Sequence, residues 1–357
     1  MYRHFLQIPA SDYTVTSESR IDENTLFLNI ETTGLSYRNA FIFMIGTARL
    51  SGDHFEVTCL LAENRRDEPD MLNDLKQALK EVRSLVTFGG RLFSYRFLTE
   101  RWDNSHGEDE PLFENLEMTD IQQILNNCRS ILPLEDVKKR TVEAWLGIHR
   151  DHPMTGKELI NTYMHWESGK DTDPEKLISH HLEDMASLIR MYPCLSYDFK
   201  RIDLHKAIIQ GPDDQGTINI MLPPFVPFPK ATDCRNACAY YKMEGPVLHI
   251  QISCREGKLR YYLPGPVKDY DYLPLEDQAV HKSVSRFVDK AHRRPATKET
   301  CYTTAYGLFL PIPENHAEDL LFKEDLSSKE RYLLYDEREW KETAPKVLSY
   351  IQSLLNI

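Results

Sequence analysis

The segment from Thr25 to Glu31 constrains the fold most, because it combines a buried strand with two polar residues near its end. Along it, Leu26, Leu28 and Ile30 alternate with Phe27, Asn29 and Glu31. This is the pattern of a β-strand packed in a core. The period of two places Asn29 and Glu31 on the same face, about 7 Å apart along the strand. Thr32-Thr33-Gly34 then predicts a turn. The pair indicates either a functional site or an ordinary core strand with a polar end.

Two later segments carry polar residues in related patterns. Residues 84–88 are predicted to form a second apolar strand, and Ser94 follows soon after it. His180 and Asp184 stand four residues apart, so they share one face of a predicted helix. The apolar stripe of that helix is separate from them and comprises Ile178, Leu182, Met185 and Ile189. His180 and Asp184 are therefore expected to face the strand residues, with a solvated surface pair as the alternative, and His181 is expected on the helix surface.

These segments together resemble the DEDD-type 3′–5′ exonucleases of the ribonuclease H-like superfamily, and within them the YprB-like group. The family's first motif, Asp-x-Glu-Thr-Thr-Gly-Leu, corresponds here to residues 29–35, with Asn29 in place of the Asp. The second motif, Asn-Gly-x-x-Phe-Asp, keeps Gly90 and Phe93 but has Gly89 and Ser94 at its two polar positions. The resemblance extends over most of residues 20–311, including a C-terminal extension found in bacterial members.

The resemblance implies a two-metal site for phosphodiester cleavage. By position, the four metal-binding carboxylates of the family correspond to Asn29, Glu31, Ser94 and Asp184. Magnesium prefers anionic oxygen ligands, and only Glu31 and Asp184 are anionic. We therefore expect at most one weakly held Mg²⁺ or Mn²⁺ ion, bound by Glu31, Asp184 and Asn29. His180 would orient or deprotonate the attacking water in an intact enzyme and is expected to be a remnant here.

Two accounts of the missing carboxylates stay open. Asp103, Asp120 or Glu183 could supply a replacement, although no spacing singles one out. Asp to Asn is also a common inactivating exchange made by design, but the additional changes at Gly89 and Ser94 favour natural decay of the site.

The order of predicted elements indicates an α/β fold. Strands over residues 26–31, 41–50 and 55–62, a helix over 72–82 and a strand over 85–88 follow the order of a ribonuclease H-like mixed sheet flanked by helices. A lead segment to about residue 22 is expected to precede the first strand, and helices are expected from 91 to 191. We predict a ribonuclease H-like domain at residues 1–195 and a smaller α+β C-terminal module at 196–357, with strands at 217–222, 247–253 and 259–263.

The clearest nucleic-acid signal lies in the C-terminal module. Residues 281–298 hold six Lys and Arg residues against one Asp. The spacing predicts a helix within residues 275–294 whose apolar face, with Val284 and Phe287, is buried. Its outer face is expected to contact phosphates through Lys282, Arg286, Lys290, Arg293 and Arg294. A merely solubilising charged face is the alternative.

The charge and hydropathy of the whole chain bound its function. A net charge of −12 opposes a simple nucleic-acid binder, although local patches decide contact. No apolar run of about 18 residues exists, and no signal-peptide core opens the sequence, which predicts a cytoplasmic protein without a membrane span. The leading expectation is an exonuclease homologue that binds single-stranded nucleic acid, with impaired or absent cleavage. An active exonuclease with a rearranged metal site and a protein-interaction module are the alternatives.

Overall fold

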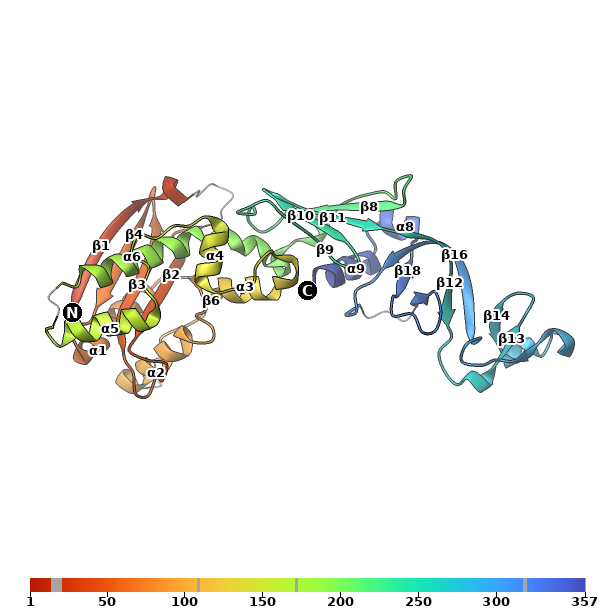
Figure 1. Ribbon diagram of the computed structural model, residues 1–357, viewed down its shortest axis with the longest axis horizontal. Helices are drawn as coiled ribbons and strands as arrows, with labels where there is room; N and C mark the ends of the chain where they lie inside the picture. The colour runs from red at the N-terminus through yellow and green to blue at the C-terminus, as the bar shows by residue number, and fades with distance from the viewer. Residues whose placement is uncertain (14–20, 108–109, 171–172, 317–319, 357) are drawn as a thin grey trace. The chain divides into compact units, whose positions relative to one another are not determined.

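The computed structural model describes residues 1–13, 21–107, 110–170, 173–316 and 320–356 (Figure 1). Their contacts divide the chain into two compact units. Unit 1 comprises Met1–Asp198 together with Phe225–Lys230, and unit 2 comprises Phe199–Pro224 together with Ala231–Ile357.

Unit 1 is built on a six-stranded mixed sheet in the order β1-β4-β3-β2-β5-β6. The first four of these strands pair antiparallel, whereas β2, β5 and β6 pair parallel. This mixed sheet confirms the predicted fold class. The strands are β1 (Tyr2–Pro9), β2 (Thr25–Thr32), β3 (Ile42–Ser51), β4 (His54–Leu61), β5 (Ser84–Thr87) and β6 (Glu117–Asp120).

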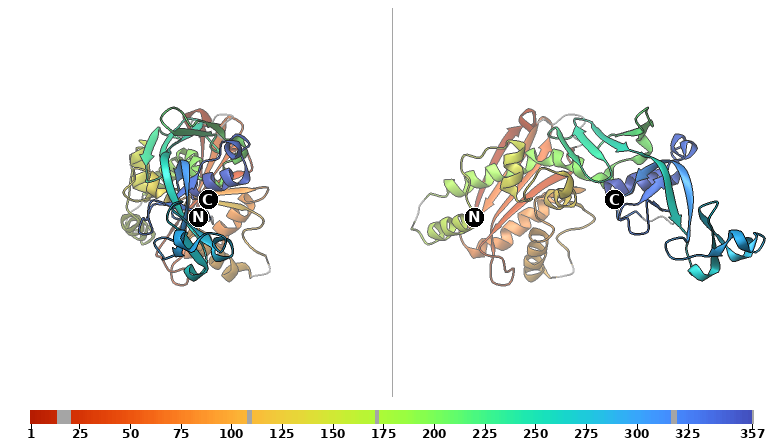
Figure 2. Two further views of the ribbon diagram at one scale, coloured as in Figure 1. Left: turned by 90° about the vertical axis from the view of Figure 1, so that its right-hand side faces the viewer. Right: turned by 45° about the vertical axis from the view of Figure 1, so that its right-hand side comes forward.

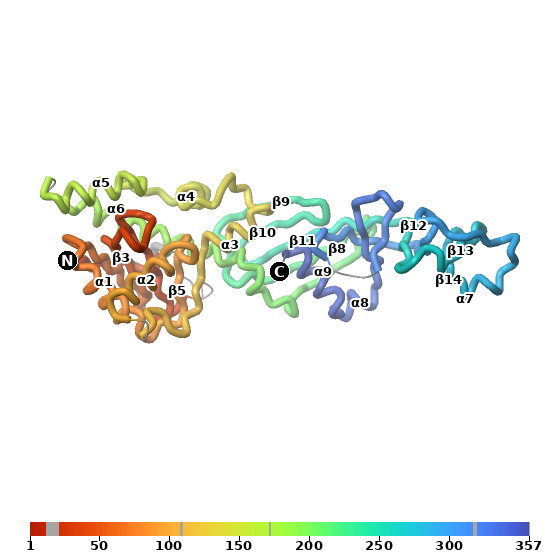
Figure 3. Tube along the Cα trace, turned by 90° about the horizontal axis from the view of Figure 1, so that it is seen from below, coloured from red at the N-terminus to blue at the C-terminus, as the bar shows by residue number. Residues whose placement is uncertain are grey.

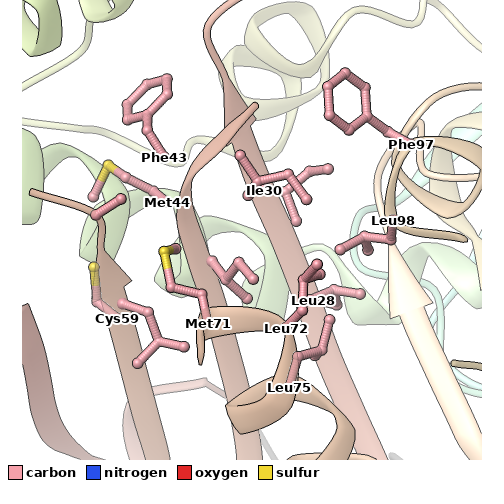
Figure 4. Packing of buried hydrophobic residues seen from close by; sticks show 14 of the residues in the cluster. Leu28, Ile30, Phe43, Met44, Cys59, Met71, Leu72, Leu75, Phe97 and Leu98 are labelled. Carbon is pink, nitrogen blue, oxygen red and sulfur yellow. The ribbon is translucent and has the colours of Figure 1, made fainter. Parts of the chain in front are cut away.

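Helices cover both faces of this sheet. They are α1 (Glu68–Ala78), α2 (Ser94–His106), α3 (Ile121–Asn127), α4 (Lys139–Leu146), α5 (Gly156–Glu167) and α6 (Glu175–Arg190). Helix α6 contacts β2, β3 and β4, and α1 contacts β3 from the other side (Figure 3). Figure 4 shows Leu28 and Ile30 of β2 packed with Leu72 and Leu75 of α1. The alternate residues Asn29 and Glu31 therefore face α6.

Both edges of the sheet differ from the sequence expectation. The lead segment holds strand β1, which pairs along its whole length with β4, from Tyr2 opposite Leu61 to Pro9 opposite His54. Strand β6, inside the region expected to be helical, pairs with β5. Neither strand has one buried apolar face along its whole length. All residues of β1 are exposed or half-buried, and the first two residues of β6 are exposed. Hydrogen bonding to the free edge of a neighbouring strand decides their conformation, and local sequence does not reveal it.

Unit 2 consists mainly of β-structure. A five-stranded sheet runs in the order β7-β8-β11-β10-β9, a closed barrel is formed by β12-β16-β18-β17, and a three-stranded sheet by β14-β13-β15. Residues 263–301, which contain the small sheet, lie between the paired ends of β12 and β16 (Figure 2). The bounds are β7 (Ile208–Gln210), β8 (Thr217–Leu222), β9 (Thr232–Arg235), β10 (Tyr240–Glu244), β11 (Val247–Ser253), β12 (Arg255–Tyr262), β13 (Tyr270–Leu273), β14 (Gln278–His281), β15 (Arg294–Pro295), β16 (Tyr302–Pro311), β17 (Phe322–Lys323), β18 (Tyr332–Leu334), α7 (Lys282–Ser285), α8 (Glu337–Lys341) and α9 (Pro345–Leu355).

The helix predicted within residues 275–294 is wrong. Helix α7 holds only Lys282–Ser285, a 3-10 turn spans Lys290–His292, and Arg294–Pro295 is strand β15, paired with β13. The predicted apolar face is exposed, with Val284 at 57% and Phe287 at 78%. A buried network explains the break, because Ser285 Oγ and Arg293 Nη1 both donate to Asp271 Oδ2, at 2.6 and 3.2 Å. A straight helix could not also pair residue 294 with β13.

Within the described ranges, no helix is long and apolar enough to cross a membrane.

Candidate functional site

Three of the predicted site residues meet where β2 approaches α6. Asn29 Nδ2 donates to Asp184 Oδ2 at 2.8 Å and lies 3.5 Å from Glu31 Oε1. Strand periodicity places Asn29 and Glu31 on the α6 side, and α6 carries Asp184 to them. The amide therefore acts as a hydrogen-bond donor between two carboxylates. An Asp at this position would bring three acids together and would remove the donor that lies between Glu31 and Asp184.

Two cations that were not predicted from the sequence complete this cluster. Lys139, at the start of α4, places Nζ 2.7 Å from Asp184 Oδ2. Arg150, in the segment between α4 and α5, places Nη1 2.5 Å from Asp184 Oδ1 and 3.4 Å from Glu143 Oε1. The side chains of Lys139 and Arg150 are only 20% and 10% exposed. Both oxygens of Asp184 are thus held by buried positive charge.

The charges of the cluster set the ionisation of its acids. Burial opposes ionisation of Asp184, but the positive charges of Lys139 and Arg150 outweigh it and hold the pKa of Asp184 well below its usual range. Burial raises the pKa of Glu31 to about 7, and the negative charge of Asp184 adds to this effect. Only Asp184 is therefore firmly anionic at neutral pH.

A divalent ion does not fit this set of donors. Asn29 turns its NH₂ group toward the carboxylates, and Glu31 is readily protonated. Asp184 already binds an ammonium and a guanidinium group, whose charges would repel a metal at the same oxygens. In the described part of the chain, no group of three or more His, Cys, Asp or Glu residues is arranged to hold a metal ion.

The other predicted site residues have different surroundings. Ser94 is the first residue of α2 and is buried, and none of the hydrogen bonds or ion pairs among described residues joins it to Asn29, Glu31 or Asp184. Asp120 caps α3 and accepts from the backbone N–H groups of Gly89 and Arg91. Glu183 pairs with His152 at 2.7 Å. These contacts engage Asp120 and Glu183 with other groups, and Glu183 also lies 3.9 Å from Nε of Arg150. Asp103 lies within α2.

His180 holds the chain segment that carries Arg150. Its Nδ1 lies 2.9 Å from the carbonyl oxygen of His152, 3.2 Å from the backbone nitrogen of Met154 and 3.1 Å from Nη2 of Arg150. Burial lowers the pKa of His180, so the ring is neutral near pH 7. These contacts position Arg150 against Asp184, and the expectation that His180 is a remnant of a water-activating residue stays a prediction.

His181 was expected on the helix surface, and this expectation is wrong. The side chain is fully buried, and burial lowers its pKa to about 3. It faces Gly46 of β3, the residue paired with Asn29. A Cβ atom at Gly46 would lie 2.4 Å from His181 Nε2 and 2.8 Å from Met185 Sδ. The buried face of α6 is thus broader than its apolar residues alone indicate, and it includes His181, which packs against the sheet.

Gly46→Ala is expected to destabilise the protein by about 1–3 kcal/mol, because the added methyl group overpacks the contact between α6 and β3. Urea unfolding measures the change. Gly156→Ala is the matched control, since an added Cβ there meets no atom within 4 Å. Combining Gly46→Ala with His181→Ala should cost less than the two separate changes together. Equal costs at Gly46 and Gly156 would contradict this packing.

Glu31→Gln is expected to remove a pH dependence of stability. Glu31 has a pKa near its ordinary 4.5 when unfolded and about 7 when folded. The folded protein therefore holds the proton more tightly, so the stabilising contribution of Glu31 is complete below about pH 4.5 and is lost as the pH rises through about 7. The free energy of unfolding of the unmodified protein, minus that of the variant, should fall across this range.

Urea unfolding of both proteins at several pH values between about 4.5 and 8 gives this difference. The comparison with the variant is necessary because His180 and His181 act with the opposite sign. Their lowered pKa values make stability fall as the pH drops below their ordinary 6.5. A difference that stays constant with pH would show that Glu31 ionises like an exposed carboxylate.

The comparisons with known proteins agree with this architecture. Residues 26–196 match the family model described as the RNase_H superfamily. No match to a curated protein was found. The matched residues span strands β2 to β6 and helices α1 to α6, including Asn29, Glu31 and Asp184. Residues 26–196 therefore form a ribonuclease H-like domain.

Proposed function

We propose that this chain is a nucleic-acid-binding relative of the DEDD-type 3′–5′ exonucleases, of the YprB-like group, that does not cleave its substrate. The observation that carries the proposal is the pairing of both Asp184 oxygens with Lys139 and Arg150. Hydrolysis by the two-metal route requires carboxylates that are available to the ions. Here two fixed cations compensate the acid instead, and Asn29 supplies a donor. The cluster thus keeps Asn29, Glu31 and Asp184 together, while the negative charge of Asp184 is neutralised by cations of the protein itself.

Support for nucleic-acid binding comes from the ribonuclease H-like domain and from a basic segment in unit 2, residues 282–294. Lys282, Arg286, Lys290 and Arg294 are exposed there. Arg293 is engaged with Asp271, so it is not counted among the phosphate contacts. The exposed ring of Phe287 lies 4.7 Å from the guanidinium carbon of Arg286. Cations beside an exposed aromatic ring suit single strands, whose phosphates and unstacked bases are both accessible.

Of the alternatives, an active exonuclease with a rearranged site is disfavoured by the commitments of Asp120 and Glu183 described above. A protein-interaction module makes a different prediction, because it requires no affinity for nucleic acid. Binding of a labelled single strand at several salt concentrations distinguishes a nucleic-acid-binding protein from a protein-interaction module.

Replacing Lys282, Arg286 and Lys290 by Ala is expected to weaken single-strand binding and to flatten its salt dependence. Each lost phosphate contact reduces the slope of log K against log salt by about 0.7, so three reduce it by about 2. Fluorescence anisotropy measures the slope, and the same strand is assayed for cleavage with Mg²⁺ and Mn²⁺. The control is Lys206→Ala with Arg338→Ala and Lys341→Ala, three exposed cations that change the net charge equally.

An unchanged slope in the first triple variant would exclude the basic segment as the contact. Metal-dependent trimming by the unmodified protein would overturn the loss of cleavage. An unmodified protein without affinity for single strands would favour the interaction module.

A further inference from the structure

A cavity of about 500 Å³ lies in unit 1, and none of its lining residues belongs to the Asp184 cluster. Its wall includes four carboxamide side chains, together with Arg91 and the exposed Leu92. The carboxamides are Gln122, Gln123, Asn126 and Asn127. The volume falls within the range of about 300–1,000 Å³ that is typical of small-molecule sites.

Part of the cavity wall is fixed by partly buried hydrogen bonds. Asp120 accepts from the backbone N–H groups of Gly89 at 2.8 Å and Arg91 at 2.9 Å, which ties the loop after β5 to the start of α3. Gln122 Nε2 donates to the carbonyl oxygen of Val137 at 3.0 Å. Gly89 has φ +75°, and a Cβ there would lie 2.8 Å from Gln122 Oε1. The backbone of the wall and the Gln122 side chain are therefore held in place before binding, which lowers the entropic cost of binding.

The groups that face the cavity differ in their chemistry. Asn126 and Asn127 are exposed, and each offers one acceptor and two donors. Arg91 uses Nη1 to donate to Gln123 Oε1 at 2.8 Å, and a guanidinium has further N–H groups. Leu92 is 88% exposed and provides an apolar surface. Amides, one cation and one apolar side chain correspond to the edge, the phosphate and the face of a nucleotide.

We propose that this cavity binds one nucleotide of a single strand, with the carboxamides at the base edge, Leu92 at the base face and Arg91 at the phosphate. Carboxamides pair with base edges because both carry donors and acceptors side by side. A wholly apolar ligand would leave the amides unpaired, and a bare phosphate would use Arg91 and the amide NH₂ groups but neither the amide oxygens nor Leu92. The inference rests on the proposed function and extends it from the basic segment of unit 2 to a specific site in unit 1.

The cavity is also connected to the Asp184 cluster through the chain. Val137 accepts from Gln122 in the cavity wall, and Lys139, two residues later, donates to Asp184. Segment 137–139 thus has one end at each site. A nucleotide seated in the cavity lies against the same segment that supplies one of the two cations.

Titration of the full chain with adenosine, AMP, cytidine, CMP and inorganic phosphate, followed by NMR or calorimetry, tests the site. We expect nucleotides to bind more tightly than nucleosides and than phosphate. Asn126→Ala with Asn127→Ala should weaken nucleotide binding about tenfold, since each lost hydrogen bond costs about 2–10-fold. Arg91→Ala should weaken binding of nucleotides but leave that of nucleosides unchanged. Gln77→Ala, at an exposed amide on α1, is the matched control.

Three results would overturn the cavity proposal: no nucleotide binding, phosphate binding as tight as AMP binding, or an equal loss in the Gln77 variant. Its failure is distinguishable from failure of the proposed function. If long single strands still bind through the basic segment with their salt dependence intact, only the cavity assignment falls. If the unmodified chain binds no single strand at all, the proposed function falls as well.

Discussion

Asn29→Asp combined with Lys139→Ala is expected to raise the affinity for Mn²⁺ at the Asp184 cluster more than about tenfold, the lower end of the effect of disturbing a metal's supporting residues. The change replaces the donor that faces Asp184 by a third carboxylate and removes one of its two cations. The formal charge of the group made by residues 29, 31, 139, 150 and 184 thereby falls from zero to minus two. Anionic oxygens with less competing positive charge suit a hard divalent ion.

The pH dependence of this double variant provides a second signature. Two carboxylates as close as positions 29 and 184 cannot both ionise easily, so a proton is retained at one of them. A metal must displace that proton, and its affinity should therefore increase with pH. Calorimetric titration with Mn²⁺ at two pH values measures this directly. The metal should also raise the free energy of unfolding, because it binds only the folded chain.

Matched variants separate the contributions. Asn29→Asp alone keeps Lys139 and should gain little affinity, because the ammonium group compensates the new charge. Adding Ser94→Asp to the double variant tests the position of the second motif, since it should increase affinity further only if residue 94 belongs to the same site. A double variant that binds Mn²⁺ no better than the unmodified chain would contradict the conclusion that Lys139 excludes the ion.

Arg150→Ala is expected to reduce the free energy of unfolding by about 3–5 kcal/mol, the usual cost of removing one partner of a buried ion pair. Arg150 is 10% exposed and contacts Asp184, Glu143 and the carbonyl oxygen of His180. Its removal leaves buried negative charge with less compensation. It also releases the segment around His152 and Met154 that His180 holds.

Urea unfolding followed by tryptophan fluorescence suits this measurement, because Trp102, Trp145 and Trp166 all lie in unit 1. Arg3→Ala is the control, since Arg3 forms an ion pair with Asp74 at 2.7 Å in the same unit but is 48% exposed. An exposed pair contributes about 0.2–1 kcal/mol. Similar losses in the two variants would show that Arg150 is not a buried structural cation.

The central part of the sheet could be predicted from the sequence because its signals are local. Strands β2, β3 and β4, helix α1 and strand β5 all follow from apolar periodicity, and each lies within a few residues of its predicted range. The faces on which Asn29 and Asp184 lie were predictable for the same reason, whereas their meeting was implied by the resemblance to the DEDD exonucleases. A strand period fixes the face of Asn29, a helix period fixes the face of Asp184, and the family motif supplied the pairing.

The structure decided whatever depends on partners distant in the chain. Strands β1 and β6 form because a neighbouring edge is available, and the predicted basic helix gives way to α7 and β15 because Asp271 and β13 bind part of it. His181 is buried because Gly46 leaves room for its ring.

The residues that change the chemistry of the site also depend on partners that are distant in the chain. The sequence by itself predicted that Asn29, Glu31 and Asp184 gather at one point, and its resemblance to the DEDD exonucleases implied that two of that group's four carboxylates are missing. It did not determine what compensates the remaining charge, because Lys139 lies 45 residues from Asp184 and no local pattern links the two residues. Only the packing of α4 and its following segment against α6 brings Lys139 and Arg150 to the carboxylate, since electrostatic attraction depends on distance in space and on burial.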